Sequence, residues 1–178
     1  MQKRKKYKDF LSFPNKGPVT FGHVNYNDLR FLGVVSNDYH SRAYKFCFVR
    51  NPYARAVSLF NYLKKIQLIS KNIEFENFLD DVYLRRPSIG LHNTLGLSQT
   101  NPQCDWIFDG DQLLVDEIFR LEELEKFNTK VNLDKKYNLS SDNLTFDKFI
   151  DNRSIIEKIE QIYSRDFDVL DYKRISDN

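Results

Sequence analysis

Cysteine is scarce in this sequence, because only two of its 178 residues, Cys47 and Cys104, are cysteine. Neither belongs to a CxxC pair or to a Cys/His spacing of the kind that holds a metal ion. We therefore expect reduced thiols, a cytoplasmic location and a functional site without a metal ion.

The sequence also has no long apolar run and no strong charge imbalance. No window approaches the roughly 18 to 20 uninterrupted apolar residues of a membrane-spanning helix, and the charged beginning lacks the apolar segment of a signal peptide. The formal net charge of +2 is too small to indicate a nucleic acid or a membrane surface as a partner. Basic residues do crowd positions 3–8, which we interpret as a solvated tail, with nucleic-acid binding as the alternative. We expect a soluble chain.

Apolar and aromatic side chains, in contrast, are plentiful, at 41% and 15% of the residues. A chain of this length and content buries one substantial core, so we expect a single domain over residues 23–178. Residues 1–22 contain Pro14, Gly17 and Pro18 among lysines and predict an irregular basic segment.

Apolar periodicity divides the chain into alternating strand-like and helix-like pieces, which predicts an α/β fold. One strand is expected over residues 44–49, covered on both faces as in a parallel sheet, and a second over 113–119. In the last helix we expect the isoleucines to pack inward and Glu157, Lys158 and Glu160 to face water. Helices are expected from Asn25 or Asn27 through Leu32 and over residues 53–63, 75–82, 124–131 and 155–163, with a turn at 109–111.

The most informative stretch is FCFVRNPYARAVSLF, residues 46–60, in which a strand pattern changes into a helix pattern. Pro52 suits the first turn of a helix, which makes Asn51 the expected N-cap. At such a junction the free backbone N–H groups and the helix dipole attract anions. Arg50 adds a planar set of donors that matches phosphate oxygens.

Arg55 and Ser58 extend this polar side, because Ser58 lies two helical turns beyond Asn51. Arg50, Asn51, Arg55 and Ser58 therefore form a candidate anion site, with ordinary solvated surface residues as the alternative. No GxxxxGK[ST] motif is present in the sequence, so the ligand need not be ATP or GTP. Gln99 and Asn101 are further candidates for ligand contact, with ordinary loop polarity as the alternative.

His23 is the candidate general base, within TFGHVNYNDLRFLG. Because imidazole titrates at about pH 6.5, a neutral His23 would take a proton from a substrate hydroxyl at neutral pH. The alternative is a packed or solvent-facing imidazole.

The segment FCFVRNPYARAVSLF resembles the 3′-phosphate-binding segment of the sulfotransferases that use 3′-phosphoadenosine 5′-phosphosulfate (PAPS). In that family Arg-x-Pro follows a strand and a serine follows in the next helix, and Arg50, Pro52 and Ser58 match those places. FGHVNYNDLRFLG is similar to the Gly-His-Val segment of carbohydrate sulfotransferases, notably the uronosyl 2-O-sulfotransferases. The likeness covers about residues 20–172.

The resemblance implies a P-loop-NTPase-like parallel sheet flanked by helices. It also implies transfer of a sulfuryl group from PAPS to a hydroxyl of a carbohydrate acceptor, without a metal ion. Arg50 and Ser58 would hold the 3′-phosphate, with Asn51 and Arg55 beside them. His23 would deprotonate the acceptor oxygen as it attacks sulfur in line with the leaving phosphate.

The sequence departs from the family near its beginning. The family's Pro-Lys-x-x-Gly-Thr-Ser loop, which holds the 5′-phosphosulfate, is not recognisable, and the nearest stretch has Asn15 at the lysine position. We therefore expect an N-terminally truncated form of the fold. Phe21 replaces a second histidine of the 2-O-sulfotransferases, and Lys148 is the candidate for a lysine of a later loop. The alternative function is a catalytically inactive sulfotransferase-like module that binds a nucleotide or a protein.

Overall fold

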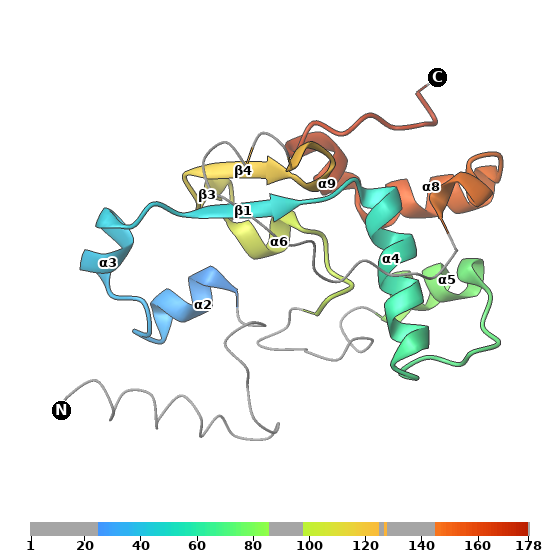
Figure 1. Cartoon of the computed structure of the whole chain (residues 1–178), viewed down its shortest axis with the longest axis horizontal. Helices are drawn as coiled ribbons and strands as arrows, with labels where there is room; N and C mark the ends of the chain where they lie inside the picture. The colour runs from blue at the N-terminus through green and yellow to red at the C-terminus, as the bar shows by residue number, and fades with distance from the viewer. Residues whose placement is uncertain (1–24, 86–97, 125–126, 128–144, 178) are drawn as a thin grey trace.

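The computed structural model describes residues 25–85, 98–124, 127 and 145–177. These residues form a mixed α/β structure with a small parallel sheet, a β-hairpin and surrounding helices (Figure 1). In chain order the elements are α2 (Tyr26–Phe31), α3 (Asn37–Arg42), β1 (Phe46–Val49), α4 (Pro52–Lys65), α5 (Phe75–Arg85), α6 (Cys104–Ile107), β2 (Phe108–Asp109), β3 (Gln112–Leu113), β4 (Glu117–Arg120), the 3₁₀ turns η2 (Leu121–Glu123) and η3 (Phe146–Phe149), α8 (Arg153–Ile162) and α9 (Ser164–Val169).

The first described helix, α2, confirms the expectation for residues 25–32. The side chain of Asn25 caps it by accepting a hydrogen bond of 2.8 Å from the backbone N–H of Asp28. Gly33 follows the helix with a φ of +68°, a left-handed conformation that glycine adopts without strain. The next helix, α3, was not expected, and Ser36 caps it.

The parallel sheet consists, in the described residues, of β1 and β4. Phe46 lies opposite Glu117 and Val49 lies opposite Arg120. Helices α4, α5 and α6 and the hairpin lie between the two strands in sequence, which supplies the long crossover that parallel strands need. The expected strand at 44–49 is therefore confirmed, with slightly narrower bounds.

The expectation that both faces of β1 are covered is wrong. Cys47 and Val49 point to the covered face, where Val49 is buried. On the other face Phe46 and Phe48 stay 42% and 37% exposed. Their rings contact each other and the ring of Phe119 on β4, so an aromatic cluster covers this face only in part.

The strand expected over residues 113–119 is wrong in its extent. The turn at 109–111 is confirmed, with Gly110 at a φ of +60°, and it joins β2 and β3 in an antiparallel hairpin that includes Leu113. Strand β4 begins afterwards, at Glu117. The apolar pattern of the sequence continues through the break between β3 and β4. At this break the side chain of Asp116 contacts Lys45.

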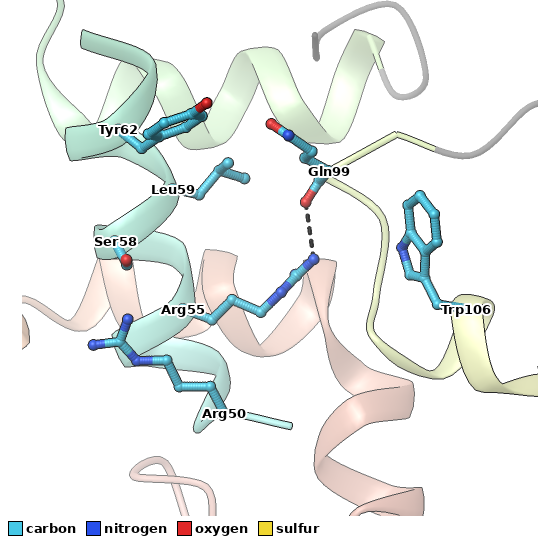
Figure 2. A pocket seen from close by; sticks show the side chains of 7 residues that line it. All are labelled: Arg50, Arg55, Ser58, Leu59, Tyr62, Gln99 and Trp106. Atoms are coloured by element: carbon cyan, nitrogen blue, oxygen red, sulfur yellow. Dashed lines mark hydrogen bonds between the residues drawn. The ribbon is translucent and has the colours of Figure 1, made fainter. Parts of the chain in front are cut away.

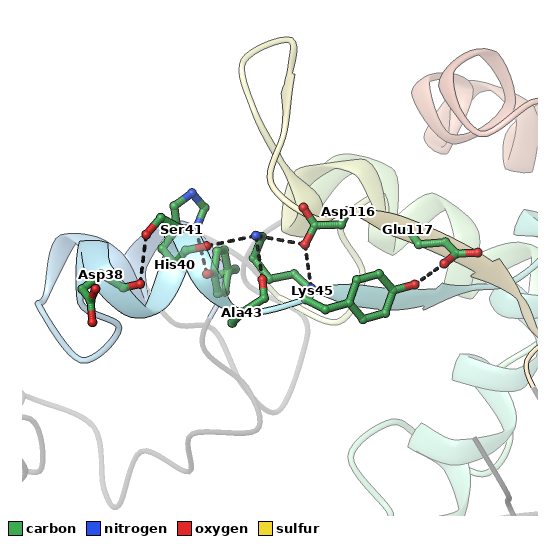
Figure 3. A network of polar contacts seen from close by, with 9 residues as sticks. Asp38, His40, Ser41, Ala43, Lys45, Asp116 and Glu117 are labelled. Atoms are coloured by element: carbon green, nitrogen blue, oxygen red, sulfur yellow. Dashed lines mark hydrogen bonds and ion pairs between the residues drawn. The ribbon is translucent and has the colours of Figure 1, made fainter. Parts of the chain in front are cut away.

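Lys45 makes those contacts and fixes the amino end of the sheet (Figure 3). Its ammonium group donates to the carbonyls of His40 and Ala43, both at 3.0 Å, and pairs with the carboxylate of Asp116 at 2.9 Å. The backbone N–H of Lys45 also donates to that carboxylate, at 2.7 Å. These hydrogen bonds from Lys45 lower the pKa of Asp116. Lys45 thus joins the end of α3 to the start of both parallel strands.

The core lies mainly between α4, α5 and α8, which pack against one another. The apolar face predicted for α4 is confirmed, since Tyr53, Ala56, Val57, Phe60 and Leu63 are all buried. The helix expected at 75–82 is confirmed as α5, and the one expected at 155–163 as α8. Their buried side chains are Phe75, Phe78, Leu79 and Val82 on α5, and Ile155, Ile156, Ile159 and Ile162 on α8.

Glu160 is buried, which corrects the expectation that it faces water. Its side chain on α8 is only 8% exposed, because it turns toward α4 and the chain after α9. Its carboxylate accepts hydrogen bonds from the Tyr53 hydroxyl, the Ser176 hydroxyl and the backbone N–H groups of Ile175 and Ser176. Buried carboxylates need such donors, and helical periodicity does not reveal them.

The other two polar residues of α8 behave differently. Glu157 is exposed, as expected. Lys158 is partly covered, because its ammonium group pairs with Glu76 at 3.0 Å and Asp80 at 2.7 Å on α5.

Some expectations fall outside the described residues. These include the irregular segment 1–22, His23 and most of the helix expected at 124–131, before which Leu121–Glu123 form a 3₁₀ turn. Within the residues that are described, no helix combines the length and the apolar character needed to cross a membrane.

Candidate anion-binding site

A cleft of about 370 Å³ opens at the carboxyl end of β1 (Figure 2). Two sides of it come from α4 and from the loop that leads into α6. This is the end of a parallel sheet at which α/β proteins commonly bind ligands. The side chains that line it are Arg50, Arg55, Ser58, Leu59, Tyr62, Gln99 and Trp106.

Arg50 is the residue between β1 and the N-cap of α4. Its backbone N–H donates to Oε1 of Gln103 at 2.8 Å, and its carbonyl accepts from Nε2 of the same side chain at 2.8 Å. Its side chain and Ser58 both line the cleft (Figure 2). Among the described residues, the guanidinium has no hydrogen-bond or ion-pair partner, so it is available to a ligand.

Asn51 caps α4, as predicted. The cap occupies the backbone N–H groups at the amino-terminal end of the helix. Its side-chain oxygen accepts from the N–H of Tyr53 at 3.0 Å and of Ala54 at 3.3 Å, and its own N–H donates to Glu122 at 2.7 Å. Pro52 has no N–H. The expectation that free backbone N–H groups bind the anion is therefore wrong. Asn51 also does not line the cleft.

Arg55 lines the cleft but is engaged mainly with the protein. Its Nη2 donates to the carbonyls of Gln99 at 2.8 Å and Asn101 at 2.9 Å. Its guanidinium lies over the ring of Tyr163, 5.3 Å from the centroid. Its Nη1 is buried and has no hydrogen-bond partner in the described structure. Arg55 therefore anchors the loop before α6 and retains one donor atom.

Ser58 lies on α4 and lines the same cleft as Arg50. Its hydroxyl has no hydrogen-bond partner within the described residues. Figure 2 shows Arg50 and Ser58 on one side, whereas Arg55 extends across to Gln99. The structure thus brings together three of the four residues predicted to form the site, and leaves Asn51 outside it.

The remaining walls are partly apolar, and the sequence interpretation did not include them. Tyr62 is 45% exposed, and Leu59 and Trp106 are partly buried. Aromatic rings at the edge of a cationic cleft suit a ligand that combines an anionic group with a flat ring. Tyr62 was discoverable, because it lies one helical turn beyond Ser58. No local pattern in the sequence indicated that Trp106 lines the cleft.

The cleft is electrostatically positive. Two of the described residues that line it are arginines and none is acidic. His40, the histidine inside the described ranges, belongs to α3, at the opposite end of β1. Lys148 is exposed on η3 and does not line the cleft. Within the described residues, no three His, Cys, Asp or Glu side chains gather into a group that could hold a metal ion.

Comparisons with family models, with curated proteins and with solved structures found no match for this chain. The proposal for its function therefore rests on the sequence resemblance and on the residues of the cleft.

Proposed function

We propose that this protein is a PAPS-dependent sulfotransferase whose cleft binds the 3′-phosphate of PAPS through Arg50 and Ser58. The supporting observation is that an arginine and a serine line one positive cleft at the carboxyl end of β1 without partners among the described residues. A phosphate ester accepts hydrogen bonds from both groups, and the guanidinium supplies the opposite charge.

The P-loop-NTPase-like arrangement belongs to this proposal. It is supported by the parallel pairing of β1 with β4 and by the direct passage from β1 into α4. We also propose a cytoplasmic location, with which the free thiols of Cys47 and Cys104 are compatible.

In the proposed reaction a hydroxyl oxygen of a carbohydrate acceptor attacks the sulfur of PAPS while the bond from sulfur to the phosphate oxygen breaks. His23 takes the hydroxyl proton, and adenosine 3′,5′-bisphosphate leaves with the electron pair. Positioning of the two substrates and neutralisation of the leaving charge supply most of the rate enhancement in reactions of this type. The reaction as proposed uses no metal ion.

The alternative is a sulfotransferase-like module that binds a nucleotide without transferring sulfate. It is favoured by the absence of a recognisable phosphosulfate loop from the sequence. Within the described residues, the parallel sheet also has only two strands.

Calorimetric titration with two nucleotides tests the 3′-phosphate site. The wild-type protein is expected to bind adenosine 3′,5′-bisphosphate more tightly than adenosine 5′-monophosphate, which lacks the 3′-phosphate. Arg50→Ala is expected to remove this preference, since it removes the charged donor. Arg153→Ala is the matched control, because Arg153 is an exposed arginine on α8 that pairs with Glu157. Preference that survives in Arg50→Ala rejects the site.

A transfer assay then separates the enzyme from the non-catalytic module. Radiolabelled PAPS is incubated with a panel of glycans, and sulfate incorporation is measured beside nucleotide affinity. Transfer to any acceptor supports the enzyme. Tight binding of the bisphosphate with no transfer to any acceptor supports the module.

A further inference from the structure

We infer that Gln103 and Asp166 are positioning residues that aim Arg50 at the bound phosphate. This inference rests on the proposed 3′-phosphate site and deepens it. Neither residue lines the cleft, so both act through the backbone of Arg50.

The side chain of Gln103 pairs with the backbone N–H and carbonyl of Arg50, as a neighbouring strand would. The pairing of β1 with β4 ends at Val49, opposite Arg120, so Arg50 lies just beyond the ladder. The primary amide of Gln103 then accepts from the Arg50 N–H and donates to the Arg50 carbonyl, both at 2.8 Å. Since each bond needs a different end of the amide, the two together fix its orientation. The peptide groups on both sides of the Arg50 Cα are thereby held.

Asp166, on α9, holds Gln103 in turn. Its side chain is fully buried, at 0% exposure. One carboxylate oxygen accepts from the backbone N–H of Gln103 at 2.9 Å and from its side-chain Nε2 at 3.3 Å. The other oxygen accepts from the backbone N–H of Cys104 at 2.9 Å. The side-chain nitrogen of Gln103 therefore donates to both Arg50 and Asp166, and these two bonds restrict the side chain of Gln103 to one conformation.

The two arginines of the cleft are held in different ways, and this difference gives Gln103 its role. Arg55 is fixed through its own guanidinium, which binds the carbonyls of Gln99 and Asn101. The guanidinium of Arg50 has no such partner in the described structure, and Gln103 fixes only the backbone from which the Arg50 side chain extends. Gln103 therefore sets the place from which the Arg50 side chain reaches the phosphate, and the guanidinium turns into its bidentate contact when the phosphate binds.

The experiment measures the ratio of the dissociation constants for adenosine 5′-monophosphate and adenosine 3′,5′-bisphosphate. Gln103→Met keeps the length of the side chain and removes both hydrogen bonds to Arg50, together with the one from Nε2 to Asp166. It is expected to lower the ratio about tenfold, because small misplacements of a binding group are costly. A purely structural role would lower thermal stability and leave the ratio unchanged. Gln161→Met, at an exposed glutamine that binds Tyr83 on α5, is the matched control.

Two further variants sharpen the result. Gln103→Asn retains the amide on a shorter side chain and is expected to lower the ratio as well, so the test survives if Gln103→Met does not fold. In an Arg50→Ala background, Gln103→Met is expected to cause no further loss of affinity for adenosine 3′,5′-bisphosphate, since its action passes through Arg50. Additive losses in the double variant would overturn the inference.

Hydrogen exchange of the unliganded protein tests the same relay without any nucleotide. The backbone amide of Arg50 is expected to exchange faster in Gln103→Met and at the wild-type rate in Gln161→Met. A wild-type protein with no preference for the bisphosphate would reject the proposed 3′-phosphate site, and the positioning role with it. A preference that remains in both Gln103 variants would reject the positioning role alone.

Discussion

The hydroxyl of Tyr53, on α4, donates a hydrogen bond to the carboxylate of Glu160, on α8. The same carboxylate binds the backbone N–H groups of Ile175 at 3.1 Å and Ser176 at 3.2 Å, so it links the helix of the cleft to the chain after α9. Burial by itself would raise the pKa of Glu160. The hydrogen bonds from Ser176 and Tyr53 outweigh it and lower the pKa below the ordinary value of 4.5.

Glu160→Gln is expected to destabilise the fold in a pH-dependent way. A lowered pKa means that the fold favours the ionised carboxylate, so this stabilisation is complete above pH 4.5 and is lost as the pH falls below it. At neutral pH the variant should lose about 1 to 3 kcal/mol, and the difference from wild type should shrink in acid. Urea unfolding across this pH range measures it. Glu157→Gln, on the exposed face of α8, should change stability by less than about 0.5 kcal/mol.

Arg55→Lys is expected to loosen the loop that carries Gln99 and Asn101. Lysine keeps the charge, but its side chain is one bond shorter and does not carry a donor to the position from which Nη2 binds both carbonyls, so the loss should be about 1 to 2 kcal/mol. Hydrogen exchange of residues 98–103 and the free energy of unfolding measure the effect. If exchange there stays at the wild-type rate while nucleotide affinity falls, Arg55 is a ligand contact rather than an anchor.

Substitutions of Asn51 separate a helix cap from a ligand contact. Asn51→Ala removes the acceptor for the N–H groups of Tyr53 and Ala54 and should cost about 1 kcal/mol of stability. Asn51→Ser keeps a capping oxygen and should restore most of that loss. Because Asn51 does not line the cleft, Asn51→Ser should bind adenosine 3′,5′-bisphosphate like wild type. Weak binding of the bisphosphate by this well-folded variant would show that Asn51 contacts the ligand.

His23→Ala is expected to spare donor binding and to remove sulfate transfer. The substitution deletes the proposed base, but it leaves Arg50 and Ser58 in place for the 3′-phosphate. Calorimetry with adenosine 3′,5′-bisphosphate and the radiolabelled transfer assay measure the two effects separately. Full turnover by the variant would exclude His23 as the base.

Local signals in the sequence were sufficient to predict the junction that builds the cleft. Pro52, the capping residue Asn51 and the spacing of apolar residues all act within one or two helical turns, and α4 begins where they indicate. The same spacing placed Arg55 and Ser58 on one side of that helix. These features depend on near neighbours, which the sequence displays directly.

The contacts that the sequence did not predict join residues that are far apart in the chain. Helical periodicity assigned Glu160 to the exposed face of its helix, and it could not reveal the partner Tyr53, which is 107 positions away. Gln103 gave no signal, since its role depends on Arg50, 53 positions earlier, and on Asp166, 63 positions later. The free N–H groups expected at α4 were lost to Asn51 and to Glu122, which approaches from beyond β4. Only the assembled fold brings such groups together.

Trp106 is the one tryptophan of the sequence, and its side chain borders the cleft. The protein therefore carries a built-in optical reporter at the place where the nucleotide is proposed to sit. Titrations can follow its emission without a dye, and stopped-flow traces of the same signal would give the rates of arrival and departure for each variant.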